Sequence, residues 1–180
     1  MLNLNVSMRY AKAFFPIAQE NGNIEDILQE LKSINDLIKN SADFRLLLKS
    51  PIISSVKKKR IFEAIFKNKI SKITYNFIIL LVNKNREELL EAIYWSYLIL
   101  YNREKGLIPY KVIVAKELDE NAKIKINEFV EKETKLKPIP EYVIELDIIG
   151  GMKINISDWV YDASIQNQLK RLKNTFLGIN

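Results

Sequence analysis

Few residues in this chain have the chemistry that catalysis needs. The sequence contains no Cys and no His, which excludes thiol nucleophiles, catalytic imidazoles and almost every zinc site. It also lacks the glycine-rich loops of the GxxxxGK[ST] or GxGxxG type that hold phosphate groups. We therefore predict a protein that is not an enzyme and that uses no cofactor and no metal.

Two short motifs remain as candidates for binding or acid-base chemistry. Glu87 and Glu88 are adjacent carboxylates, but at the start of a helix such residues mainly interact with the helix dipole. Gly150 and Gly151 form the only glycine pair, which makes either an anion-binding nest or a turn between two strands. The strand-like pattern on both sides favours the turn.

The positive net charge makes nucleic acid a candidate partner. Lys and Arg number 28 against 22 Asp and Glu, a net charge of +6, and the segment Lys57–Arg60 is an uninterrupted basic run. Clustered positive charge is what phosphate contacts require. No aromatic or glycine-rich recognition motif accompanies the run, so a solvated helix face is the simpler interpretation. A basic helical nucleic-acid-binding module is kept as the alternative function.

Hydrophobic residues recur at helical spacing throughout the N-terminal part of the chain. Residues 24–38 form the clearest amphipathic stripe, and Asn23 precedes it as a possible N-cap. Ser41, Ser54 and Ser71 can cap helices that follow. Six helices joined by short connections predict an α-helical bundle.

The pattern changes at Gly106 and Pro109, which can end the last helix and prevent its continuation. We therefore expect one domain over residues 1–105 and another over residues 106–180. The second combines strand-like runs with two helical stripes in the order β-α-β-β-α, and Asp162 can cap its final helix. The predicted fold class is mainly α, with a six-helix bundle followed by a small mixed α/β domain.

Two helices carry more apolar surface than one core-facing stripe needs. The first has a stripe that includes Phe14, and beside it a second stripe of Tyr10, Ala13 and Ile17. The segment Phe77–Val82 is apolar on every side. Each extra face either lies in the centre of the bundle or lines a groove for an amphipathic partner helix.

The N-terminal residues show no targeting signal. They lack the basic and apolar regions of a signal peptide and the Arg- and Ser-rich character of a transit peptide. No apolar run approaches the roughly 20 residues of a membrane span. We expect an uncleaved cytoplasmic protein.

Four motifs occur in order along the chain. They are Arg9-Tyr10-Ala11-Lys12-Ala13-Phe14; Pro51 with Ser54 and Lys58; Phe77 with Leu80, Leu81 and Arg86; and Glu145, Ile148, Gly150, Gly151, Met152, Ile154, Asn155 and Ser157 followed by Asp162, Ser164, Ile165, Leu169 and Leu172. At these spacings they resemble the delta subunits of bacterial F-type ATP synthases, counterparts of the mitochondrial oligomycin-sensitivity-conferring protein. The resemblance spans essentially the whole chain.

The resemblance implies a stator subunit without catalysis of its own. In that family, an N-terminal six-helix bundle binds N-terminal segments of the α subunits on the α3β3 head, and the C-terminal domain binds the b subunits of the peripheral stalk. Such a subunit stops the head from turning with the rotor and so supports proton-coupled ATP synthesis. It would lie on the cytoplasmic face of the bacterial inner membrane, attached only through the complex.

The family's α-subunit groove lies between the first and fifth helices. The resemblance places it at Tyr10, Ala13, Phe14, Ile17, Phe77, Ile78, Leu81 and Val82. It gives Gly150, Gly151, Asp162 and Ser164 structural roles. Pro16 lies inside the first helix, where the missing backbone donor and a clash with the preceding turn predict a kink or a restart.

Overall fold

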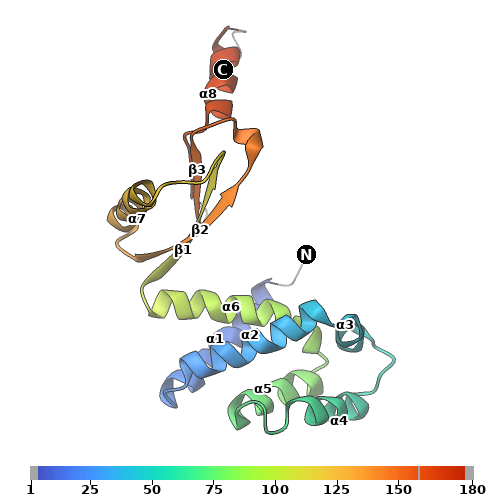
Figure 1. The fold of residues 1–180 in the computed structure, drawn as a ribbon. Helices are drawn as coiled ribbons and strands as arrows, with labels where there is room; N and C mark the ends of the chain where they lie inside the picture. The colour runs from blue at the N-terminus through green and yellow to red at the C-terminus, as the bar shows by residue number, and fades with distance from the viewer. Residues whose placement is uncertain (1–3, 158, 177–180) are drawn as a thin grey trace. The chain divides into compact units, whose positions relative to one another are not determined.

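The chain folds into two compact units. The computed structural model describes residues 4–157 and 159–176, and the units are Met1–Tyr101 and Asn102–Asn180 (Figure 1). Unit 1 is all helical and unit 2 holds a small sheet. The division falls inside the last helix of unit 1, slightly before the boundary at residue 105 that the helix-ending glycine suggested.

Six α-helices and one 3-10 turn form the helical part. They are α1 (Leu4–Glu20), α2 (Ile24–Asn40), α3 (Ala42–Lys49), α4 (Ser55–Phe66), α5 (Lys72–Asn83), η1 (Glu87–Leu89) and α6 (Leu90–Glu104). The side chains of Ser41, Ser54 and Ser71 accept the backbone N–H groups that open α3, α4 and α5, which confirms these three caps. Asn23 occupies the N-cap position of α2, but its side chain makes no capping bond.

Helix α1 passes through Pro16 without interruption, so the predicted restart is wrong. The proline removes one backbone donor, and Pro16 is on the exposed surface of the helix, where water can solvate the freed carbonyl. The helix ends instead at Glu20, and Gly22 follows it with a φ of +68°, which only glycine adopts easily. There the amides of Gly22 and Asn23 donate to the carbonyls of Gln19 and Ala18, a Schellman ending.

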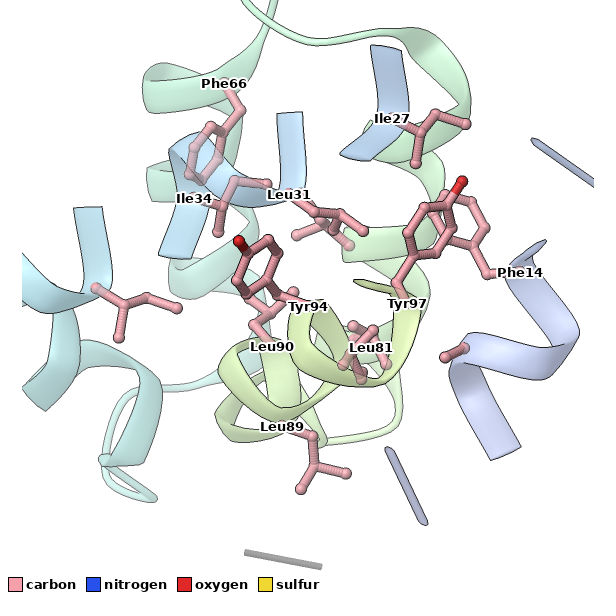
Figure 2. Packing of buried hydrophobic residues seen from close by; sticks show 14 of the residues in the cluster. Phe14, Ile27, Leu31, Ile34, Phe66, Leu81, Leu89, Leu90, Tyr94 and Tyr97 are labelled. Atoms are coloured by element: carbon pink, nitrogen blue, oxygen red, sulfur yellow. The ribbon is translucent and has the colours of Figure 1, made fainter. Parts of the chain in front are cut away.

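Large apolar side chains from all six helices make up the core of unit 1 (Figure 2). Tyr97 is fully buried, with its ring centroid 6.0 Å from that of Phe14 and 5.1 Å from that of Phe15. Its hydroxyl donates to the carbonyl of Ile24 at 3.3 Å, and burial raises the pKa of Tyr97. This aromatic cluster joins α1, α2 and α6.

Unit 2 has one more strand than the sequence predicted. Its elements are β1 (Leu107–Val114), α7 (Glu120–Thr134), β2 (Lys137–Ile144), η2 (Leu146–Ile148), β3 (Met152–Ile156), β4 (Trp159–Asp162) and α8 (Ile165–Phe176). The strand order is β2-β1-β3-β4. Strands β1 and β2 are parallel and are connected through α7, whereas the pairs β1–β3 and β3–β4 are antiparallel. The unexpected strand, β4, is a short edge strand whose first three residues are exposed, so it carries no alternating burial signal.

The core of unit 2 is separate and smaller. Val112, Ile154 and Ile156 from the sheet pack with Ile126 and Val130 from α7. The N-cap that positions α7 is Asp119, whose carboxylate accepts the amide of Ala122 at 2.7 Å. Prolines occur on the outer strand β2, which fits the rule that edge strands tolerate a missing ladder donor.

Candidate interaction surfaces

Helices α1 and α5 are joined by a stack of two phenylalanine rings. The centroids of Phe14 and Phe77 are 4.0 Å apart and the rings are nearly parallel, at 6°. Phe14 is buried in the core, whereas Phe77 is half-buried and packs against the outside of that core. The stack therefore lies just beneath the surface where the two helices meet.

The eight predicted groove residues divide into two groups by burial. Phe14, Ile78, Leu81 and Val82 are each no more than 2% exposed and belong to the core. Their side chains offer no surface to a partner, which corrects their assignment to the groove. Tyr10 and Phe77 are half-buried, and Ala13 and Ile17 are exposed. The second stripe of α1, formed by Tyr10, Ala13 and Ile17, is thus the one that faces outward.

Helix α5 contributes two apolar residues that were missing from the predicted groove. Ile73 is half-buried and Leu80 is 45% exposed. They lie four residues before and three residues after Phe77, a spacing that puts all three on one face of a helix. The same periodicity could have identified them, but an all-round apolar helix gives no sequence signal for which face is outward. Tyr10, Ala13, Ile17, Ile73, Phe77 and Leu80 are called the α1/α5 surface below.

Helix α8 presents a second unpartnered apolar stripe in unit 2. Ile165, Leu169, Leu172 and Phe176 lie at helical spacing and are 42%, 52%, 54% and 87% exposed. No residue of α8 is buried among those described. The helix also carries Lys170, Arg171 and Lys173 and no acidic residue. An amphipathic helix with nothing covering its apolar face is typical of a binding element.

Gly151, the second residue of the glycine pair, is required by a close backbone approach. Gly151 has φ +76°, and a Cβ on it would lie 2.3 Å from the carbonyl oxygen of Ala163. A Cβ on Gly150 would meet the side chain of Ile165 at 2.8 Å, and the Gly150 carbonyl accepts the amide of Ile165 at 2.9 Å. The pair therefore lets the turn before β3 pack against the start of α8.

Ser164, rather than Asp162, is the residue that caps α8. Its hydroxyl oxygen accepts the amide of Asn167 at 3.1 Å. The carboxylate of Asp162 in turn accepts the hydroxyl and the amide of Ser164, at 2.6 and 3.0 Å. The bond from the Ser164 hydroxyl is the main reason why the pKa of Asp162 is held below its usual range. Both residues fix the direction in which α8 leaves the sheet.

The basic run on α4 does not form a continuous cationic patch. Lys58 is only 5% exposed, and its ammonium is paired with the carboxylate of Glu87. Lys57 and Arg60 are exposed, but with Lys58 inside the fold the run loses one of its phosphate-binding groups. Glu87 is likewise a buried ion-pair partner, a role that its place in a first helical turn did not suggest. Among the residues described, no helix is both long and apolar enough to span a bilayer.

Known relatives agree with the resemblance over the full chain. The subunit delta of ATP synthase from Clostridium botulinum is 34% identical, covering 94% of each chain. That from Alkaliphilus metalliredigens is 33% identical over 97% of each, and that from Desulforamulus reducens is 30% identical over 99% of this chain and 98% of its own. These relatives give no support to the nucleic-acid alternative.

A solved structure shares the fold. One chain of the cryo-EM structure of the Toxoplasma gondii mitochondrial ATP synthase hexamer superposes with a TM-score of 0.71, covering 95% of this chain and 97% of that chain. Its 21% identity makes this a likeness of fold alone. The profile of the family described as ATP synthase delta (OSCP) subunit matches residues 6–176. The chain therefore belongs to the ATP synthase delta (OSCP) subunit family.

Proposed function

We propose that this chain is a non-catalytic stator subunit of an F1Fo ATP synthase. Unit 1 binds the N-terminal segment of an α subunit on the α3β3 head, and unit 2 binds the b subunits of the peripheral stalk. The chain thereby resists rotation of the head and supports proton-coupled ATP synthesis. It sits at the cytoplasmic face of the bacterial inner membrane and contacts the membrane only through the complex.

The observation that carries this proposal is the presence of one exposed apolar surface on each unit. The α1/α5 surface lies on a bundle with its own core, and the α8 stripe lies on a unit with another. A tether between two partners needs two such surfaces and no reactive groups. Membership of the ATP synthase delta (OSCP) subunit family supports a place in the ATP synthase complex, and the α and b subunits as its partners there are part of the proposal.

An amphipathic helix laid along the α1/α5 surface would bury an area near the lower end of stable interfaces, roughly 1,200 Å² in total. Affinity would then depend on a few anchors that meet exposed side chains such as Ile17 and Leu80. The stacked rings of Phe14 and Phe77 beneath them keep the two helices at a fixed spacing.

Calorimetric titration of the full chain with a peptide from the α-subunit N-terminus of the same organism tests the proposal. We expect saturable one-to-one binding that survives moderate salt, because the contacts are apolar. Ile17→Asp and Leu80→Asp should each weaken it at least about tenfold, the loss of one interface hot spot, without changing helicity. Phe14→Asp should instead disrupt the fold, because it puts a charge into the core.

Ile124→Asp is the matched control for this titration. Ile124 is 51% exposed on α7 in unit 2, so the change in side chain is the same but is made on the other unit. Unchanged affinity of the folded Ile17→Asp and Leu80→Asp variants would contradict the α1/α5 assignment.

A further inference from the structure

A polar cavity lies between the end of α3, the following loop, α4 and the start of η1. Its volume is about 370 Å³, and its wall includes Ser50, Lys58, Asn85, Glu87 and Glu88. None of these residues belongs to the α1/α5 surface or to α8. The cavity is large enough for a side chain or a small molecule.

The cavity wall contains a buried carboxylate oxygen without a partner among the described residues. Glu87 is 4% exposed; its Oε1 pairs with the Lys58 ammonium, while its Oε2 is shielded from solvent and makes no hydrogen bond within residues 4–157 and 159–176. Lys58 also donates weakly to the Leu48 carbonyl, at 3.5 Å. A buried carboxylate with an unused acceptor is expected to bind a donor.

The charges around the cavity favour a cationic donor. Glu88 adds a second carboxylate, and the C-terminal end of α3, where the helix dipole is negative, lies at the same wall. Of the two lysines in the wall, Lys58 is already paired with Glu87, and Lys49 is exposed and free to extend into water. A planar guanidinium has several donors in one fork and is weakly hydrated, so it suits two carboxylates better than an ammonium does.

We propose that this cavity binds the guanidinium of an arginine side chain from a partner protein. The guanidinium would donate to Oε2 of Glu87 and to the carboxylate of Glu88. The site is separate from the surfaces of the proposed function, and it stands or falls independently of them.

A titration of the ¹⁵N-labelled full chain with ethylguanidinium at constant ionic strength tests the site. We expect saturable shifts of the amides of Ser50, Asn85, Glu87 and Glu88, with a dissociation constant of about 1–10 mM for so small a probe. Ethylurea has nearly the same shape and also donates, but it is neutral. It should bind at least about fivefold more weakly, because only the charged group gains from both carboxylates.

Three variants localise the effect. Glu88→Gln should weaken binding about two- to fivefold, the range for loss of one exposed charge contact. Glu87→Gln alone would leave Lys58 buried and unpaired, so Lys58→Met/Glu87→Met is used instead, and it should abolish the shifts. Glu63→Gln, which alters an exposed ion pair on the same helix α4, is the control and should have no effect.

Equal binding of ethylurea, shifts that persist in the double variant, or a response that never saturates would each overturn the proposal. In those cases the cavity holds water only, and a water molecule rather than an arginine completes the hydrogen bonding of Glu87.

Discussion

Gly151 and Gly106 have similar backbones but different surroundings. Both have positive φ, +76° and +62°, and both lie in unit 2. A Cβ on Gly106 meets nothing within 4 Å, whereas one on Gly151 meets the Ala163 carbonyl at 2.3 Å. The second glycine of the pair is therefore required by space as well as by conformation.

Replacement of these glycines by alanine separates the two effects. Gly106→Ala should cost about 1 kcal/mol, the strain of a left-handed conformation on a residue with a Cβ. Gly151→Ala should cost at least about 3 kcal/mol, because backbone must also move. Urea unfolding of both variants, followed by circular dichroism, gives the comparison. Equal losses would mean that the contact with Ala163 relaxes without cost.

Asp162 makes the stability of α8 depend on pH. Because the folded pKa is lowered by the bonds from Ser164, the stabilisation is fully present above the ordinary value of 3.8 and is lost as the pH falls through the folded value. Below a pH of 3.8, the protection of the α8 amides against exchange, relative to an unfolded chain at the same pH, should therefore decrease.

The Asp162→Asn variant supplies the test of that dependence. It cannot titrate, so its α8 amides should be less protected than wild type at neutral pH and should show a flatter acid response. Ser164→Ala, which removes the hydroxyl donor, should return the pKa of Asp162 toward its ordinary value. NMR hydrogen exchange across the pH range reports both. If Asp162→Asn showed the same pH dependence of α8 protection as wild type, the loss of protection in acid would come from other carboxylates.

At the level of elements, the ion pair of Lys58 and Glu87 joins α4 to the turn that leads into α6. Both side chains are almost completely buried, whereas the Lys67–Glu63 pair on α4 is exposed. A buried pair is expensive to break, because the remaining charge stays inside without compensation. An exposed pair contributes little.

A double-mutant cycle checks this contrast. Lys58→Met alone should lower the free energy of unfolding by about 3–5 kcal/mol, and adding Glu87→Met should restore most of that loss. The same cycle at Lys67 and Glu63 should show little coupling. Additive losses at Lys58 and Glu87 would mean that the pair is not coupled in the folded protein.

At the level of the whole molecule, the two hydrophobic cores share no residue. A substitution on the surface of one unit should therefore leave the binding surface of the other intact. This independence is what a tether requires, because each end must hold its partner whatever the other end is doing. Attachment at both ends also raises the effective concentration of each partner for its site.

We therefore predict that binding of the b subunits and binding of the α-subunit peptide can be lost separately. Leu169→Asp on α8 should abolish binding of the soluble part of the b subunits and leave binding of the α-subunit peptide unchanged. Ile17→Asp should do the reverse, while both variants keep their helicity. Co-sedimentation with b and calorimetry with the α peptide give the two readouts. Loss of both activities in one variant would contradict independent surfaces.

Much of the fold was accessible from local patterns. Serine caps, hydrophobic spacing and the break at Gly106 predicted the six helices of unit 1 and the change to a mixed unit, because these signals act within a few residues of the chain. Family motifs likewise identified the protein without any coordinates. The absence of Cys and His limited the chemistry on composition alone.

Side-chain burial was decided only by tertiary packing. Phe14 and Ile17 are both apolar residues on α1, yet one stacks on Phe77 and the other is exposed, since burial depends on where α5 and α6 lie. Lys58 reads as one member of a basic run until Glu87 is brought beside it from another helix. Contacts between residues distant in sequence leave no periodic signal in either segment, so only the folded structure could reveal them.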